Sequence, residues 1–172
     1  MSAVLEFLNN GHMLLELNHT HIVLIPKIKN PVKMSDFRPI SLYNVIYKII
    51  AKVLANRLKQ VLPQIIAPTQ SAFVPRRLIT NNVLVAYEAL HMMHGRKKGK
   101  TGNLALKLDV SKAYGRMEWS FLKQIVLKLG LPGLWVDRVM SCISSTSFSV
   151  PINGKPYGMI TPTRGLQQGD PL

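Results

Sequence analysis

Apolar residues recur at three- and four-residue steps over much of the chain, the spacing typical of helices that bury one face. The longest such stripe covers residues 45–62, and Pro63 is predicted to end that helix. The helical pattern is predicted for four further segments: 2–17, with an interruption near Asn9 to Gly11, 82–94, 117–129 and 135–143.

Three other segments have the patterns of strands. Residues 21–26 form a β-branched run closed by Pro26. Residues 104–110 are mostly apolar and predict a core strand that carries Asp109 at its end. Residues 147–160 predict a hairpin whose turn is formed by Asn153 and Gly154, a favoured two-residue turn.

Helices and strands in this order predict an α+β fold. The stretch 95–102, with Arg96, Lys97, Lys98 and Lys100, is predicted to be a flexible basic loop between two subdomains. The expected division is therefore 1–100 and 101–172.

The charge balance indicates a polyanionic partner. The chain has 172 residues, 47% of them hydrophobic, so it can bury a real core. It has 22 Lys and Arg against 8 Asp and Glu, a formal net charge of +14. Nucleic acid is the expected partner, although ribosomal, histone-like and membrane-surface proteins share such a balance.

Cysteine and histidine usage argues against a metal bound through thiolates. Cys142 is the single cysteine of the sequence, and the histidines lack a convincing ligand pattern. His19 and His21 alternate at the start of a strand and share one face, where a surface or core role is the expected one. An intracellular protein, nuclear or cytoplasmic, is expected, because the sequence shows neither a leader peptide nor an apolar stretch of membrane-spanning length.

Asp109 is the main candidate for catalytic chemistry. A carboxylate at the end of a core strand is costly unless it is paired or binds a cation. Mg²⁺ favours oxygen ligands of this kind. A strand-end aspartate also often caps the next helix, so the pattern alone leaves both roles open.

Several motifs, in order, resemble one known family. Residues 106–119, which read LKLDVSKAYGRMEW, look like the first catalytic motif of reverse transcriptases from plant non-LTR (LINE-type) retrotransposons. Residues 164–172, RGLQQGDPL, resemble the next palm motif. Five upstream segments are similar to finger motifs of that family, in the same order: 25–27, 37–42, 47–52, 55–58 and 70–74.

The resemblance implies a helix-rich fingers region over 1–100 and a partial reverse-transcriptase palm over 101–172, with an incomplete antiparallel sheet. Asp109 would be the first metal-binding catalytic aspartate, and the backbone carbonyl of Val110 a further ligand of Mg²⁺. Tyr114 would lie under the sugar of the incoming nucleotide and discriminate against a 2′-hydroxyl. Its alternative role is to pack at the start of the following helix.

The resemblance also implies a role in RNA-directed DNA synthesis, with an RNA template, a DNA primer and deoxynucleoside triphosphates as partners. Lys27 and Arg38 would contact the triphosphate. Gln168 and Gly169 would line the nucleotide and template pocket, since glycine allows close backbone approach. Without the motif, the two cations would be solvated and the Gln-Gly-Asp-Pro stretch a simple turn.

Three departures from the family pattern stand out. Gly115 replaces an aspartate that could cap the next helix, and Arg76 replaces a glycine whose backbone conformation it is expected to resist. Asn81 replaces an aspartate of the same finger motif. The second acidic motif is also missing, so the chain alone is expected to be inactive as a polymerase. The alternatives are a non-catalytic nucleic-acid-binding fragment and the relic of a decayed element.

Overall fold

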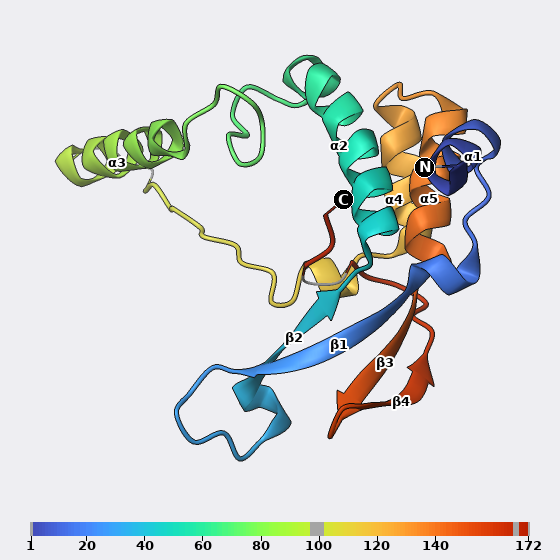
Figure 1. The fold of residues 1–172 in the computed structure, drawn as a ribbon. Coiled ribbons are helices and arrows are strands. Elements are labelled where there is room, and N and C mark those ends of the chain that lie inside the picture. The colour runs from blue at the N-terminus through green and yellow to red at the C-terminus, as the bar shows by residue number, and fades with distance from the viewer. Residues whose placement is uncertain (1, 97–101, 167–168, 172) are drawn as a thin grey trace. The chain divides into compact units, whose positions relative to one another are not determined.

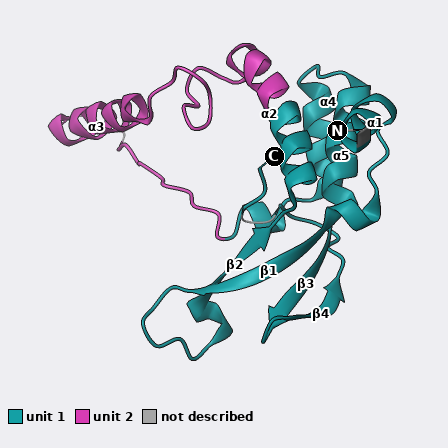
Figure 2. Ribbon diagram, viewed as in Figure 1, with its two compact units in different colours: residues 1–55, 112–172 teal, residues 56–111 magenta. Residues whose placement is uncertain are grey.

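The computed structural model describes residues 2–96, 102–166 and 169–171. Contacts divide the chain into two compact units, residues 1–55 with 112–172 and residues 56–111 (Figure 2). This division concerns packing, and the expected functional division into fingers and palm at residues 100 and 101 stays a prediction.

Unit 1 contains a four-stranded sheet in the order β2-β1-β3-β4 (Figure 1). Its strands are β1 (His19–Pro26), β2 (Phe37–Leu42), β3 (Ser147–Ile152) and β4 (Lys155–Ile160). Two antiparallel pairs, β1 with β2 and β3 with β4, meet through a parallel pairing of β1 with β3. The expected antiparallel sheet is therefore a mixed sheet, because β1 and β3 are joined by a long connection that lets them run in the same direction.

The helices of unit 1 pack around the end of the sheet where β1 and β3 begin (Figure 1). They are α1 (Ser2–Asn10), the first part of α2 (Val45–Ile65), α4 (Trp119–Lys128) and α5 (Gly133–Ser144). Asn18 Nδ2 donates a hydrogen bond to the Cys142 carbonyl at 2.7 Å and so joins the entry of β1 to α5. The main buried side chains of this core are Phe7, Tyr47, Ile50, Leu54, Val139, Cys142 and Phe148.

The amphipathic pattern of α2 is confirmed in part: Ile50 and Leu54 of the predicted stripe are buried and the basic residues are exposed. Val45 and Ile49 of the stripe are exposed, however, and Tyr47, which lay outside it, is buried. Pro63, however, lies inside the helix, which runs to Ile65, so its predicted end at Pro63 was wrong. Carbonyls at the end of the helix and in the following turn accept hydrogen bonds from a single arginine side chain further along the chain.

That side chain is Arg77. Its guanidinium donates hydrogen bonds of 2.5 to 3.1 Å to the carbonyls of Pro63, Ile66, Ala67 and Gln70. These are the carbonyls that the end of α2 and the following turn leave without a helical partner. Arg77 therefore closes the helix and fixes the loop that leads to α3 (Ile79–Gly95).

Arg76, beside it, has a φ of 66°, in the left-handed region that favours glycine. The family pattern pointed correctly to a glycine-like conformation here. The expectation that arginine would resist it was wrong, since Arg76 adopts the conformation while Arg77 holds the loop.

The predicted strand at 104–110 is absent. Residues 102–110 have no regular structure, and Leu104, Leu106 and Leu108 are 87, 74 and 81% exposed. The alternation of leucines is strand-like, but a strand forms where another supplies hydrogen-bond partners, and no described strand pairs with this segment. Whether residues 104–110 form a strand depends on a pairing strand from elsewhere in the chain, which the local pattern does not record.

Other predictions are confirmed. The hairpin of β3 and β4 turns at Asn153 (φ 50°) and Gly154 (φ 78°). Gly11, at φ 75°, ends α1 where the interruption was expected. Three short 3₁₀ helices complete the described structure: η1 (Leu15–Asn18), η2 (Met34–Asp36) and η3 (Tyr114–Arg116).

Residues 97–101 of the predicted basic loop lie outside the described residues. In the described part of the chain, no helix combines the length and apolar character needed to cross a membrane.

Candidate functional site

Two segments far apart in the sequence are clasped together in unit 1. Gly165 N–H donates to the Met117 carbonyl at 2.7 Å, and Leu166 N–H donates to the Tyr114 carbonyl at 2.9 Å. Trp119 Nε1 donates back to the Gly165 carbonyl at 2.9 Å. The segment of the predicted first catalytic motif is thus fixed to the segment that begins the next motif.

The clasp depends on a close approach of two glycines. A Cβ on Gly165 would lie 2.7 Å from the Gly115 carbonyl oxygen, and Gly165 has a φ of 82°. A Cβ on Gly115 would meet nothing within 4 Å. The N-cap of α4 is Glu118, so the expected role of position 115 as a helix cap was wrong: this residue lies in the preceding 3₁₀ turn.

Gly169 lies against β2. It has a φ of 99°, and a Cβ there would be 3.1 Å from the Ser41 carbonyl oxygen and 3.6 Å from Ile40 Cγ2. Arg38 shares a strand face with Ile40, because alternate strand residues point the same way. The structure therefore brings the glycine of the Gln-Gly-Asp-Pro motif beside the strand that carries Arg38.

The next residue, Asp170, links this segment to the helical core. Its carboxylate accepts hydrogen bonds from the Tyr43 hydroxyl at 3.2 Å and from the Tyr47 hydroxyl at 3.0 and 3.1 Å. The two tyrosine rings stack at 4.5 Å between centroids. Burial first, and then the Asp170 charge, raise the pKa of both phenols and raise the pKa of the Cys142 thiol to about 12.

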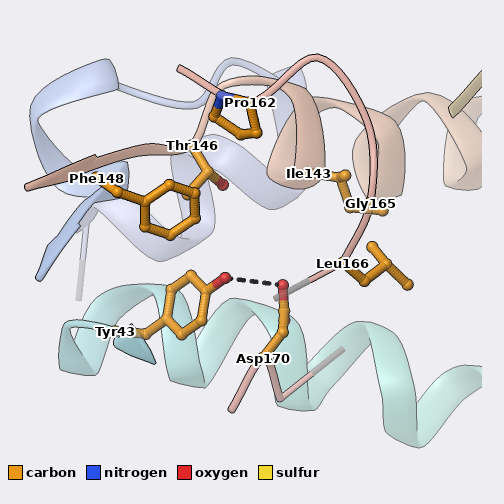
Figure 3. Close-up of a pocket in the computed structure, with 8 residues that line it drawn as sticks. All are labelled: Tyr43, Ile143, Thr146, Phe148, Pro162, Gly165, Leu166 and Asp170. Atoms are coloured by element: carbon orange, nitrogen blue, oxygen red, sulfur yellow. Dashed lines mark hydrogen bonds between the residues drawn. The ribbon is translucent and has the colours of Figure 1, made fainter. Parts of the chain in front are cut away.

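Figure 3 shows a small cavity beside this link, lined by Tyr43, Phe148, Leu166 and Asp170 among others. Its volume of about 10 Å³ is room for about one water molecule. A larger cavity of about 250 Å³ lies between α1 and α2 and is lined by Phe7 and Ile50 among others. Neither of these two cavities is lined by Lys27, Arg38, Tyr114 or Gly169.

Residues 25–172 match the family model described as reverse transcriptase (RNA-dependent DNA polymerase). The chain belongs to the reverse transcriptase family. It is 32% identical over 169 residues to the transposon TX1 uncharacterized 149 kDa protein of Xenopus laevis, covering 97% of this chain. It is 28% identical over 150 residues to the retrovirus-related Pol polyprotein from type-2 retrotransposable element R2DM of Drosophila melanogaster, covering 87% of this chain.

These relatives place the chain among reverse transcriptases of LINE-type, non-LTR retrotransposons, as its motifs predicted. The likeness to plant elements in particular stays a prediction. The chain spans 12% and 14% of the lengths of the two relatives.

In this reverse transcriptase domain, Lys27 stands at the start of the loop between β1 and β2. Its Nζ donates to the Ser35 carbonyl at 2.8 Å, and its N–H donates to the Asp36 carbonyl at 2.7 Å. The Asp36 carboxylate accepts from the N–H groups of Lys33 and Val32, which lower its pKa. The loop is thereby shaped by its own polar groups, with the Lys27 side chain exposed.

Asp109 and Val110 belong to unit 2, and both are exposed. Among the described residues, no group of three or more His, Cys, Asp or Glu side chains could hold a metal. One carboxylate and one carbonyl are ligands that suit Mg²⁺, which commonly keeps waters and substrate phosphates in its remaining positions. The donor set of this chain therefore fits one side of a magnesium site. Gln168 lies outside the described residues.

The prediction that His19 and His21 share a strand face is confirmed. His19 Nδ1 and Nε2 lie 2.8 and 3.1 Å from the hydroxyls of Ser147 and Ser149, and His21 Nδ1 lies 2.7 Å from Ser149. The serines come from β3, so these contacts tie the parallel strand pair together.

Sequence reasoning missed the link between Asp170 and the two tyrosines. Tyr43 and Tyr47 are four residues apart at the start of a helix, the spacing that places two side chains on one face. That spacing was a usable signal for a stacked pair. Their partner, more than a hundred residues later, is fixed by tertiary structure alone.

Proposed function

We propose that this chain contributes to RNA-directed DNA synthesis, in which a primer 3′-hydroxyl attacks the α-phosphate of a deoxynucleoside triphosphate on an RNA template. The observation that carries the proposal is the clasp between Tyr114 and Leu166, because it joins the two segments that resemble catalytic motifs, and both lie within the residues that match the reverse transcriptase family. The part of the reaction assigned to this chain is to bind the triphosphate and template and to supply one metal-binding carboxylate with a neighbouring backbone carbonyl.

The incoming nucleotide is assigned to the surface around β2. Arg38 would bind triphosphate oxygens with its planar guanidinium, and Lys27 would add a point charge. Gly169 supports this assignment, because its lack of a side chain lets its backbone pack closely against β2, the strand that carries Arg38. Gln168 would line the same pocket, and Tyr114 would pack under the sugar and exclude a 2′-hydroxyl.

Magnesium is the metal that the family implies. Asp109 and the Val110 carbonyl would hold it, and when bound it would stabilise the charge that develops on the reacting phosphate. The chain has no adjacent pair among its remaining acids: Glu6, Glu16, Asp36, Glu88, Glu118, Asp137 and Asp170. We infer that this chain by itself does not extend a primer, because one carboxylate does not hold two metal ions in the required geometry.

The template is assigned to basic surfaces. Eight acidic residues cannot neutralise 22 basic ones, and α2 exposes Lys48, Lys52, Arg57 and Lys59 away from its buried stripe. Exposed cations along a helix bind phosphates at positions that need no base contact. We place the action of the protein inside the cell, in the nucleus or the cytoplasm.

Primer extension on an RNA template, with Mg²⁺ and deoxynucleotides, tests the assignment of catalysis. We expect no extension by the chain alone, together with measurable binding of RNA and of a deoxynucleoside triphosphate. Extension that disappears in Asp109→Ala, but persists in the exposed control Asp137→Ala, would support the polymerase role and overturn the inference of inactivity. A folded sample that binds neither RNA nor nucleotide would overturn the proposed function.

A second candidate is nucleic-acid binding without catalysis, which the net charge of +14 favours. RNA affinity should then fall steeply with salt, and a slope of about −3 in log affinity against log salt would correspond to roughly four phosphate contacts. RNA binding without any nucleotide binding would favour this candidate over the polymerase assignment.

A further inference from the structure

Asp170 stands where the Gln-Gly-Asp-Pro segment meets the core of unit 1. Its carboxylate accepts hydrogen bonds from two hydroxyls, at 3.2 Å from Tyr43 and at 3.0 and 3.1 Å from Tyr47 (Figure 3 draws the first). Tyr43 and Tyr47 are 4 and 0% exposed, so both donors come from the interior. The carboxylate is held in one place by two fixed partners.

The Asp170 carboxylate lies beside a packed core, so the hydrogen bonds that compensate its charge matter for stability. A carboxylate beside a packed core is costly unless polar groups compensate it, and charged hydrogen bonds are the stronger kind. The charge of Asp170 contributes to the raised pKa of both phenols, which keeps their hydroxyls protonated and able to donate.

Asp170 lies at one end of the segment that follows the clasp, so its hydrogen bonds to Tyr43 and Tyr47 hold that end of the segment. The segment is fixed at its other end by Gly165 and Leu166, which hydrogen bond to Met117 and Tyr114. Gly169, next to Asp170, lies against Ser41 of β2. The hydrogen bonds of Asp170 therefore hold the chain beside Gly169. The clasp holds it at Gly165 and Leu166.

We infer that Asp170 is a positioning residue: by holding Tyr43 and Tyr47 it keeps Gly169 against β2 and so shapes the nucleotide-binding surface near Arg38. This inference rests on the proposed function. Asp170 acts through Gly169 and touches no reacting atom.

A purely structural role would give a different result. If the buried hydrogen bonds served only fold stability, their loss would lower the unfolding temperature and weaken every kind of binding alike. A positioning role predicts a local effect, in which the loop loosens and nucleotide affinity falls while RNA affinity at fixed salt is kept.

The test compares Asp170→Asn and the double variant Tyr43→Phe with Tyr47→Phe, both made in the full chain. Matched controls are Asp137→Asn, which removes an exposed carboxylate bonded to Lys123, and Tyr157→Phe on exposed β4. Amide hydrogen exchange of a peptide covering residues 163–171 reports on the loop, and dTTP and RNA binding report on function.

We expect exchange in this peptide to quicken by about tenfold in both test variants, the scale of one lost charged hydrogen bond. Exchange in residues 114–119 should not change, dTTP affinity should fall by a similar factor, and the controls should behave like the parent chain. Unchanged exchange in folded Asp170→Asn would overturn the inference, as would a parallel loss of RNA and dTTP binding with global destabilisation. If the parent chain binds no dTTP, the proposed function fails, while exchange still decides whether Asp170 anchors the loop.

Discussion

Gly165 packs so closely on Gly115 that a Cβ on Gly165 would lie 2.7 Å from the Gly115 carbonyl oxygen. The contact is backbone against backbone, so no flexible side chain can move to make room. It lets the Leu166 N–H reach the Tyr114 carbonyl. The junction of the two motifs therefore requires glycine on one side only.

Gly165→Ala should destabilise the fold by about 2 kcal/mol or more, because it adds a backbone clash to the cost of a non-glycine residue at positive φ. Gly115→Ala is the matched control and should change stability by less than about 0.5 kcal/mol, since nothing lies within 4 Å of its Cβ. Urea unfolding measures both. Equal effects of the two substitutions would contradict the one-sided packing.

The adjacent residues Arg76 and Arg77 should respond in opposite directions. Arg76→Gly relieves a left-handed conformation that costs arginine roughly 1 kcal/mol, and part of this gain is lost to the freer unfolded chain. A net stabilisation of about 0.5 kcal/mol is expected. Thermal unfolding followed by circular dichroism checks the sign.

Arg77→Ala should destabilise the end of α2 by about 1 to 2 kcal/mol, because carbonyls of Pro63, Ile66, Ala67 and Gln70 lose a charged donor. Hydrogen exchange of residues 63–70 locates the effect. A loss of stability in Arg76→Gly equal to that in Arg77→Ala would refute this account of the loop.

The loop between β1 and β2 should loosen in acid through Asp36. The Lys33 N–H, followed by the Val32 N–H, lowers the pKa of this carboxyl below its ordinary value of 3.8. The ionised form therefore stabilises the loop at pH values above 3.8, and this contribution is lost as the pH falls through the lowered pKa. NMR titration of the Asp36 carboxyl and of the two amides measures it.

Asp36→Asn should remove this acid transition while leaving the chain folded at neutral pH. A carboxyl that titrates at or above 3.8 in the parent chain would show that the two amides do not hold its charge.

Alkaline pH should destabilise the core through Tyr43 and Tyr47. Their pKa is raised above the ordinary value of 10.0 by burial and then by the Asp170 charge. The unfolded chain releases these protons above that value and the folded chain does not. Stability is therefore kept below pH 10 and falls as the pH rises beyond it, by about 1 kcal/mol per pH unit for each phenol.

Urea unfolding at about pH 9 and about pH 11 measures this loss. The double variant Tyr43→Phe with Tyr47→Phe should show a smaller decrease between the two pH values, because phenylalanine has no proton to release. An identical decrease in parent and variant would place the alkaline sensitivity in other groups.

Local sequence determined most of the elements. The helices α2, α3 and α5 follow from apolar spacing, and the hairpin of β3 and β4 follows from Asn153-Gly154, because these signals act between residues close in the chain. The motifs likewise identified the family before any contact was known. Each of these features depends on neighbours within a few residues, which is the range that a sequence pattern records.

Tertiary structure decided what depends on distant partners. The leucine alternation at 104–110 predicted a strand, yet no described strand pairs with it. Pro63 lies inside α2, and Arg77 of the following loop donates to carbonyls at the end of the helix. In both cases the hydrogen-bond partners lie outside the local pattern from which the prediction was made.

For the candidate site, too, the sequence identified the residues, and the folded chain determined their contacts. The sequence by itself named Lys27, Arg38, Tyr114 and Gly169 through their motifs. Only the folded chain brought Gly169 to β2 and gave Asp170 its two tyrosine partners, because these contacts join residues more than a hundred positions apart. Residue type and spacing identify the motif residues in the sequence. The contacts that hold these residues in place arise from the packing of the whole unit.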